Sequence, residues 1–264
     1  MSAHLQKPHL EVEHLAKSYG GVHAVKDVSF TLARGEILAL IGPNGAGKST
    51  CFNMLNGQIK ADSGRIRIGG QDTTGLKPSA VWRRGVGRTF QITATFASMS
   101  VRENVQVALL SHHGGVRRLF GYAGHAYRAE ADALLDLIGM RADAERSCAE
   151  LAYGDLKRLE LAVALANAPT LLFMDEPTAG MAPTERIDLM RLMARIAREQ
   201  SIGVLFTEHD MDVVFEHADR VMVLNRGEII AVGRPDEVRA DPRVRATYLG
   251  DGLVYDARHR EAAA

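Results

Sequence analysis

Cysteine, charge of one sign and long apolar runs are all scarce in this sequence of 264 residues. Its two cysteines, Cys51 and Cys148, lie far apart, so we expect reduced thiols in a cytosolic protein rather than a disulfide. Basic and acidic side chains number 32 each, which argues against a dedicated nucleic-acid binder. No apolar stretch is long enough to span a bilayer, and the N-terminus lacks the apolar segment of a signal peptide. Any role at a membrane is therefore expected to depend on a partner, at the cytoplasmic side.

The most informative stretch is a glycine-rich loop that reads Gly-Pro-Asn-Gly-Ala-Gly-Lys-Ser-Thr. It follows a predicted buried strand, Ile37–Ile41, and leads into a predicted helix over 48–56. This order is typical of a phosphate-binding P-loop, in which backbone N–H groups and the helix dipole face one anion. The alternative, a tight turn that only happens to be rich in glycine, does not need Lys48 and Ser49 in register. We therefore expect a nucleoside triphosphate here, with Lys48 at its β- and γ-phosphates and the Ser49 hydroxyl on Mg²⁺. The expected contact residues are Gly42, Asn44, Gly45, Ala46, Gly47, Lys48, Ser49 and Thr50.

The stretch before the P-loop predicts antiparallel strands. Residues 10–17 alternate loosely between apolar and polar, as in an exposed edge strand, and residues 25–32 predict a second strand. Tyr19 stands between them, where its ring could stack on adenine. From the residues alone, the favoured alternative is an ordinary half-buried tyrosine at a strand end.

The remainder alternates short apolar strands with amphipathic helices, which predicts a mostly parallel sheet covered on both faces. The antiparallel start and a helical stretch around 92–168 are two additions to this core. His112 and His113 favour a solvated loop over a metal site, because no third ligand stands at a sensible spacing. Strands are expected over 65–68, 85–91, 170–174, 202–206, 220–224 and 228–232, and helices over 78–84, 100–110 with Ser100 as N-cap, 126–138, 155–168, 185–200 and 235–240.

Two adjacent carboxylates end one of the predicted apolar strands. P-loop proteins hold Mg²⁺ through a carboxylate in this position, which points to Asp175. Glu176 follows directly, and it can accept a proton from an attacking water. A strand with an accidentally charged end is the alternative, and the P-loop upstream argues against it. The pair predicts hydrolysis of the bound nucleotide.

Six motifs follow one another along the sequence: Tyr19, the P-loop, Gln91, residues 151–155, residues 171–177 and His209. In their order and spacing, the sequence resembles ABC-transporter ATPase subunits over about residues 9–250. The resemblance implies that Tyr19 stacks on adenine, that Gln91 senses the γ-phosphate and the metal and couples to a membrane permease, and that His209 contacts the γ-phosphate. It implies ATP and Mg²⁺ as ligands, with Ser49, Gln91 and Asp175 on the metal.

The family also implies an architecture. We expect an α/β fold in which residues 9–91 and 169–250 form a P-loop NTPase core with an N-terminal antiparallel β subdomain. Residues 92–168 are expected to form an α-helical subdomain, and 251–264 a tail. In the family the segment around Ala152, Tyr153 and Gly154, called the signature, faces nucleotide held by a second ATPase subunit, so that ATP joins two head-to-tail chains.

A narrower resemblance rests on residues 87–91, the Tyr153-Gly154 pair and the ending over 239–250. These look like the LivG type, the ATP-binding subunits of branched-chain amino acid importers, including relatives for urea and short amides. It implies a peripheral subunit at the cytoplasmic face of the inner membrane, bound to permease subunits and served indirectly by a periplasmic substrate-binding protein. Phe96 and Met99 are candidates for docking the permease, or equally for the helical core.

Two departures from the family pattern fall on the surface that faces the other nucleotide. Ala152 stands where serine is usual, and Ala182 where asparagine or aspartate is usual. Each loss removes a polar group near the partner's γ-phosphate, and a hydrogen bond to a charged group contributes about 1.5–3 kcal/mol. We therefore expect the nucleotide site completed by this chain's signature to be the weaker of two. We also expect a different ATPase subunit as the partner, with a homodimer as the alternative.

Three other functions remain in view. A lipopolysaccharide-type ABC exporter ATPase is close in sequence class, but the Arg88-Thr89-Phe90-Gln91 form favours the importer. A soluble ABC ATPase of DNA repair or translation carries coiled-coil insertions or two ATPase domains, which this sequence lacks. A P-loop kinase would not need Gln91, the signature and His209 together.

Overall fold

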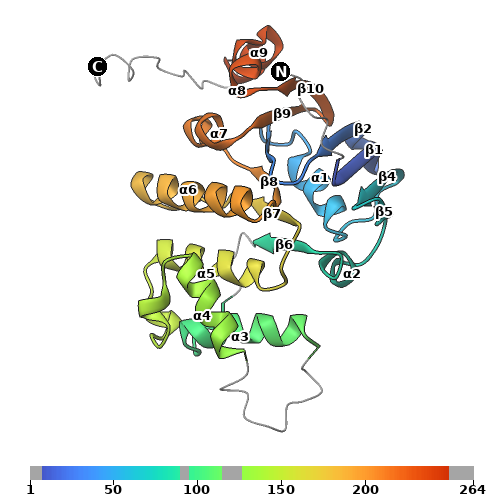
Figure 1. Cartoon of the computed structure of the whole chain (residues 1–264). Helices are drawn as coiled ribbons and strands as arrows, with labels where there is room; N and C mark the ends of the chain where they lie inside the picture. Colours follow the sequence, from blue (N-terminus) through green and yellow to red (C-terminus); the bar gives the residue numbers. More distant parts are fainter. Residues whose placement is uncertain (1–7, 90–94, 115–126, 250–264) are drawn as a thin grey trace, which may run out of the picture.

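A six-stranded sheet forms the centre of the molecule (Figure 1), of which the computed structural model describes residues 8–89, 95–114 and 127–249. The strand order is β10-β9-β3-β8-β7-β6, and every neighbouring pair is parallel except β9 and β10. The mostly parallel sheet predicted from the alternating apolar runs is thus confirmed. Its strands are β3 (Ile37–Ile41), β6 (Val86–Thr89), β7 (Leu171–Asp175), β8 (Gly203–Thr207), β9 (Arg220–Asn225) and β10 (Glu228–Gly233).

A second sheet, of four antiparallel strands, lies beside the first and has the order β2-β1-β4-β5. The prediction of an edge strand over residues 10–17 is wrong, because β1 is paired on both sides. Its second neighbour is β4, which follows much later in the chain, and the alternation within β1 carries no sign of that pairing. The strands are β1 (Leu10–Tyr19), β2 (Val22–Leu32), β4 (Ser63–Ile68) and β5 (Gln71–Asp72).

The central sheet separates two hydrophobic cores. Successive side chains of a strand point to opposite faces, and β3 shows this directly: Ile37, Ala39 and Ile41 enter one core, while Leu38 and Leu40 enter the other. The first core includes side chains of the helices α3 to α6, and the second includes those of α1 and the antiparallel sheet. This division explains why the central strands are apolar throughout, with no alternation in the sequence.

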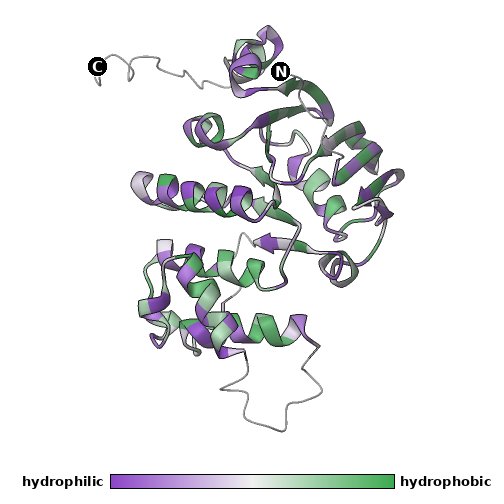
Figure 2. Ribbon diagram, viewed as in Figure 1, coloured by the Kyte–Doolittle hydropathy of each residue, from purple (hydrophilic) through white to green (hydrophobic). Residues whose placement is uncertain are grey.

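The helices confirm most of the predicted ranges but add two. α6 is amphipathic, and Figure 2 shows its hydrophobic and hydrophilic residues alternating along the ribbon. The short α7 and α9 were not predicted, since neither carries an apolar repeat of useful length. The helices are α1 (Lys48–Leu55), α2 (Pro78–Trp82), α3 (Val101–His112), α4 (Arg128–Leu137), α5 (Tyr153–Leu165), α6 (Pro183–Glu199), α7 (Met211–His217), α8 (Pro235–Ala240) and α9 (Pro242–Leu249).

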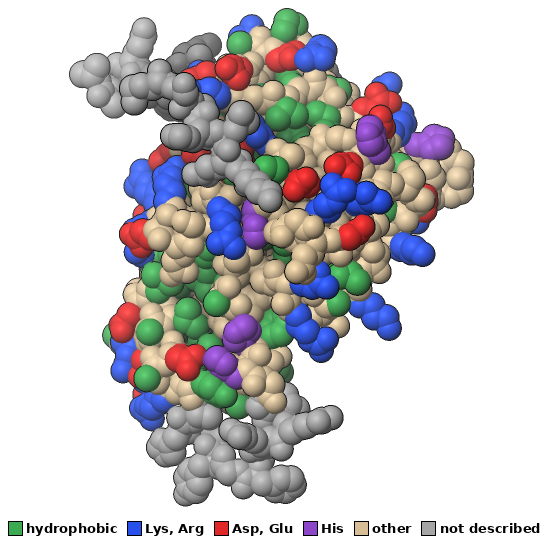
Figure 3. Space-filling model, turned by 45° about the vertical axis from the view of Figure 1, so that its right-hand side comes forward, with side chains coloured by type: hydrophobic (Ala, Val, Ile, Leu, Met, Phe, Trp, Pro, Cys, Tyr) green, Lys and Arg blue, Asp and Glu red, His purple; other side chains and the backbone are tan. Residues whose placement is uncertain are grey.

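Several local predictions can be compared with the structure directly. Ser100 is the N-cap of α3, where its hydroxyl accepts from the Glu103 N–H at 3.2 Å, as predicted. Both cysteines are buried free thiols. Residues 111–124 predict a loop or a short helix; α3 continues through His112, and residues 115–124 lie outside the described residues. On the face drawn in Figure 3, acidic, basic and hydrophobic side chains are interspersed.

Candidate functional site

Three adjacent strands end at the same edge of the central sheet, and each leads directly into predicted site residues. β3 leads into the P-loop, β7 ends at Asp175, and β8 ends two residues before His209. β8 lies between β3 and β7, and the parallel register places Thr207 beside Asp175. Carboxyl ends of parallel strands are the usual position of ligand sites in such sheets. The topology therefore gathers the predicted phosphate, metal and hydrolysis residues at one place.

The P-loop is held in shape by close backbone packing. A Cβ atom at Gly42 would lie 2.1 Å from the Leu224 carbonyl oxygen, and one at Gly47 would lie 2.2 Å from that of Ala24. Gly47 also has a φ of 103°, which favours glycine. Neither position therefore accepts a larger residue without moving the backbone.

Lys48 is the cationic group of this loop and is only 8% exposed. Its Nζ donates to the carbonyl oxygens of Gly42 at 2.7 Å and Pro43 at 3.1 Å. Burial lowers the pKa of Lys48, and the carboxylates of Glu176 and Asp175 oppose that shift. Both carboxylates therefore favour the charged form of the Lys48 ammonium.

The hydroxyl of Thr207 connects the Asp175 carboxylate to the backbone of Glu176. It donates to Asp175 Oδ1 at 2.6 Å and accepts from the Glu176 backbone N–H at 3.0 Å. Glu176 has a φ of 48°, which is uncommon for a residue with a side chain. His209 Nε2 lies 2.8 Å from Glu176 Oε1. The four residues therefore form one connected group at the sheet edge.

A second buried connection lies behind this group. Glu208, 4% exposed, accepts hydrogen bonds at its Oε1 from the backbone N–H and the hydroxyl of Thr178. The sequence reading missed both Thr207 and Glu208. The only local signal was that the apolar strand β8 ends in Thr207 and is followed by Glu208. Two polar residues at a strand end do not indicate which neighbours they contact.

The oxygen donors present fit a magnesium ion. Mg²⁺ is usually held by one or two carboxylates together with phosphate oxygens and water, rather than by a cage of protein ligands. Asp175 and Ser49 supply a carboxylate and a hydroxyl, and the part of the chain that is described has no group of three histidine, cysteine or acidic side chains that could hold a metal ion by itself. Gln91, the third predicted metal residue, lies outside the described residues.

Tyr19 ends β1 on the side of the P-loop. It pairs with Val22 across the β1–β2 turn, and Ala24 of the same hairpin lies against Gly47. Its ring is 48% exposed, and Lys17 Nζ lies 5.5 Å from the ring centre. The ring thus has an open surface near the P-loop, and stacking on adenine stays a prediction.

The predicted signature begins α5, apart from the P-loop, in the lower part of Figure 1. Ala152 is the N-cap of α5 and makes no side-chain cap, and the Tyr153 hydroxyl donates to the Ala179 carbonyl at 3.2 Å. A Cβ atom at Gly154 would lie 3.0 Å from a carboxylate oxygen of Glu185. These contacts join the signature to the segment that begins α6.

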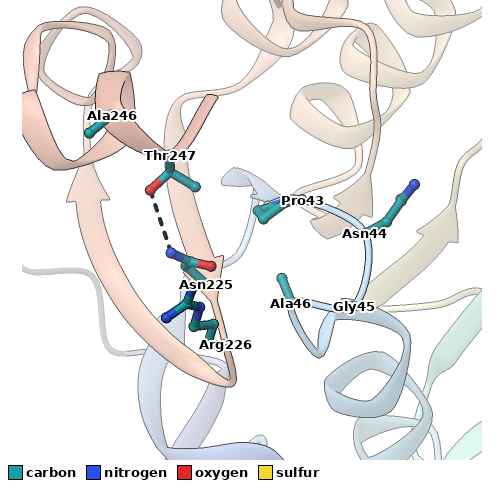
Figure 4. Close-up of a pocket in the computed structure, with 8 residues that line it drawn as sticks. All are labelled: Pro43, Asn44, Gly45, Ala46, Asn225, Arg226, Ala246 and Thr247. Atoms are coloured by element: carbon teal, nitrogen blue, oxygen red, sulfur yellow. Dashed lines mark hydrogen bonds between the residues drawn. The ribbon is translucent and has the colours of Figure 1, made fainter. Parts of the chain in front are cut away.

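The outer flank of the P-loop lines a pocket of about 540 Å³. Figure 4 shows Pro43 to Ala46 on one side and, on the other, Asn225 and Arg226 of the β9–β10 turn with Ala246 and Thr247 of α9. Asn225 Nδ2 approaches the Thr247 hydroxyl at 3.5 Å. The residues that line the pocket do not include Asp175, Glu176 or His209, so the pocket is distinct from the group around Thr207.

Two family models and several curated proteins match the sequence of this chain. A family model described as "ABC transporter" matches residues 25–179, and one described as "Branched-chain amino acid ATP-binding cassette transporter" matches residues 228–254. The chain is similar to the high-affinity branched-chain amino acid transport ATP-binding proteins BraF of Pseudomonas aeruginosa and LivG of Escherichia coli K12. The identities are 37% and 39%, over 94% of this chain and 100% of each relative.

Solved structures show the same fold. The ADP conformation of MJ1267, an ATP-binding cassette of an ABC transporter, matches with a TM-score of 0.83 and 30% identity, covering 93% of this chain and all of that one. A dimeric post-hydrolysis state of the cassette MJ0796, bound to ADP and phosphate, matches with a TM-score of 0.72 and 25% identity, covering 86% of this chain and 98% of that one.

Proposed function

The chain belongs to the ABC transporter family, and we propose that it is the ATP-hydrolysing subunit of an importer for branched-chain amino acids or related small amides such as urea. One observation supports ATP hydrolysis: Lys48, Asp175, Glu176 and His209 lie at one edge of the sheet. The match over residues 228–254 and the names of the relatives support the solute class.

Each group at the edge has a role that follows from its chemistry. The P-loop N–H groups and Lys48 bind the phosphates of ATP. Asp175, Ser49 and Gln91 hold Mg²⁺, which offsets the negative charge of the phosphates when it is bound. Glu176 accepts the proton of the attacking water, and His209, within 2.8 Å of Glu176, orients that carboxylate and contacts the γ-phosphate.

A second ATPase subunit completes the site in this proposal. The start of α5 presents free backbone N–H groups at Ala152, Tyr153 and Gly154, which suit a phosphate. Residues 9–91 and 169–250 act as the nucleotide-binding core, 92–168 as the helical subdomain and 251–264 as a tail. ATP held between two chains joins them and hydrolysis releases them, which moves the permease.

The remaining partners are a permease and, through it, a periplasmic substrate-binding protein. No helix among the described residues is long and apolar enough to cross a membrane. Phe96 is 52% exposed, which favours its role in docking the permease over a place in the helical core. The subunit then works peripherally, at the cytoplasmic face of the inner membrane.

The test is uptake by a reconstituted transporter. The chain is co-expressed with the permease, ATPase and binding-protein genes that neighbour its own, and the complex is placed in vesicles with ATP inside the compartment that the ATPase faces. We expect ATP-driven uptake of labelled leucine or urea, and its loss in Lys48→Ala, which removes the phosphate-binding cation. ATP-dependent export of a lipid-linked saccharide, with no uptake of either solute, would contradict the proposal.

A further inference from the structure

We infer that Thr207 is a positioning residue for the carboxylate that holds the cation, and that its hydroxyl sets the direction of the Asp175 side chain. This inference rests on the proposed metal role of Asp175. Thr207 is 1% exposed and lies opposite Asp175 in the parallel β7–β8 register. Its role is to act through Asp175, to which its hydroxyl donates.

The hydrogen-bond geometry gives the Thr207 hydroxyl a fixed direction. A hydroxyl has one proton to donate, and its lone pairs can accept. Because the Glu176 N–H donates to this oxygen at 3.0 Å, the proton points to Asp175 Oδ1 at 2.6 Å. A hydrogen bond to a charged carboxylate is among the stronger kinds. We therefore assign Oδ1 to Thr207 and Oδ2 to the cation.

The same contact supports the unusual backbone of Glu176. The Glu176 N–H is shared between the Thr207 hydroxyl and the Thr207 carbonyl oxygen at 3.1 Å. Glu176 has a φ of 48°, and such a conformation persists only where its surroundings hold it. One threonine thus sets both the metal-binding carboxylate and the residue proposed as the base.

A purely structural role is the alternative, in which the hydroxyl serves only to satisfy buried polar atoms. The two roles differ in what a hydroxyl-free variant changes. Thr207→Val keeps the branched shape and the backbone carbonyl, and removes only the hydroxyl. Thr207→Ser keeps the hydroxyl and loses a methyl group. A positioning role predicts that these variants differ in how strongly Mg²⁺ strengthens nucleotide binding, and a structural role predicts a difference in stability alone.

The test measures the dissociation constant of a fluorescent, non-hydrolysable ATP analogue on the full chain, in EDTA and in Mg²⁺. The ratio of the constant in EDTA to the constant in Mg²⁺ reports the contribution of the cation. We expect Thr207→Val to reduce this ratio about tenfold, as loss of an outer hydrogen bond to a metal ligand does, with the constant in EDTA unchanged. Thr207→Ser should retain the ratio. Thr207→Ala replaces Thr207→Val if the latter does not fold.

Two controls separate the possible failures. Thr73→Val removes another buried hydroxyl, which donates to the Ile66 carbonyl far from the site, and should leave the ratio unchanged. Asp175→Asn should lose most of the ratio. If Asp175→Asn loses it while Thr207→Val keeps it, the role of Thr207 is wrong and the metal site stands. If Asp175→Asn keeps it, the metal assignment falls and the inference falls with it.

Discussion

The Glu208 carboxylate accepts two hydrogen bonds from Thr178, one from the hydroxyl at 2.6 Å and one from the backbone N–H at 2.9 Å. Both residues are buried. Thr178 follows β7 and Glu208 follows β8, and the second oxygen of Glu208 accepts from the His209 N–H at 3.2 Å. The contact therefore joins the segment that carries Glu176 to the segment that carries His209.

We expect Glu208→Ala to destabilise the chain. It leaves two buried donors of Thr178 without an acceptor, and each such loss costs about 1–3 kcal/mol. The melting midpoint should fall by about 5–10 °C in calorimetry. Glu208→Gln keeps an acceptor oxygen and should lose less. Glu216→Ala, which removes an exposed carboxylate, is the matched control. An unchanged midpoint in Glu208→Ala would show that the contact contributes nothing.

Ala152 and Ala182 both occupy helix N-caps, at the starts of α5 and α6. A serine at an N-cap stabilises a helix by about 1 kcal/mol relative to alanine. We expect Ala152→Ser to raise the melting midpoint by about 2–4 °C. It should also raise turnover in the assembled complex, because in the proposed dimer the new hydroxyl would face the partner's γ-phosphate.

Ala182→Ser is the companion variant, since it caps α6 and restores a polar side chain at the second departure from the family pattern. The hypothesis that Ala152 weakens one nucleotide site would be contradicted if Ala152→Ser raised stability without raising turnover, in a complex whose two nucleotide sites are equally active. The new hydroxyl would then stabilise the helix without affecting ATP turnover.

Stability should fall below neutral pH, in part through His217. Burial lowers the pKa of His217 beneath its ordinary 6.5, opposed by Glu216 and assisted by Arg191 and Arg198. The unfolded chain then binds a proton near pH 6.5 while the folded chain does so only at lower pH. The free energy of unfolding therefore decreases as the pH falls through 6.5.

Melting curves between pH 7.5 and 5.5 test this directly. His217→Leu should lose less stability over that interval than the unchanged chain does. A residual loss is expected from His9, whose pKa is lowered by burial and by Arg34. Equal losses of stability in His217→Leu and in the unchanged chain would show that His217 does not contribute to the pH dependence.

Local signals in the sequence were enough to predict the strands and helices around the P-loop, because β3 and α1 are defined by residues close together in the chain. They also indicated Asp175 and Glu176, which stand at the end of a strand, whereas His209 was predicted only from the resemblance to the family. The pairing of β1 with β4 was missed because it joins distant segments. Thr207 and Glu208 were missed for the same reason, since their roles depend on neighbours across the sheet.

In the proposed function, Glu176 accepts the proton of the water that attacks ATP. The most direct measurement is phosphate release by the assembled complex at saturating Mg²⁺ and ATP, with Glu176→Gln compared with the unchanged chain. Loss of a general base slows reactions by about 10²–10⁴-fold. We predict a slowing of that size with ATP still bound, and an ATP-bound dimer that persists. Phosphate release from Glu176→Gln at the rate of the unchanged chain would contradict the claim.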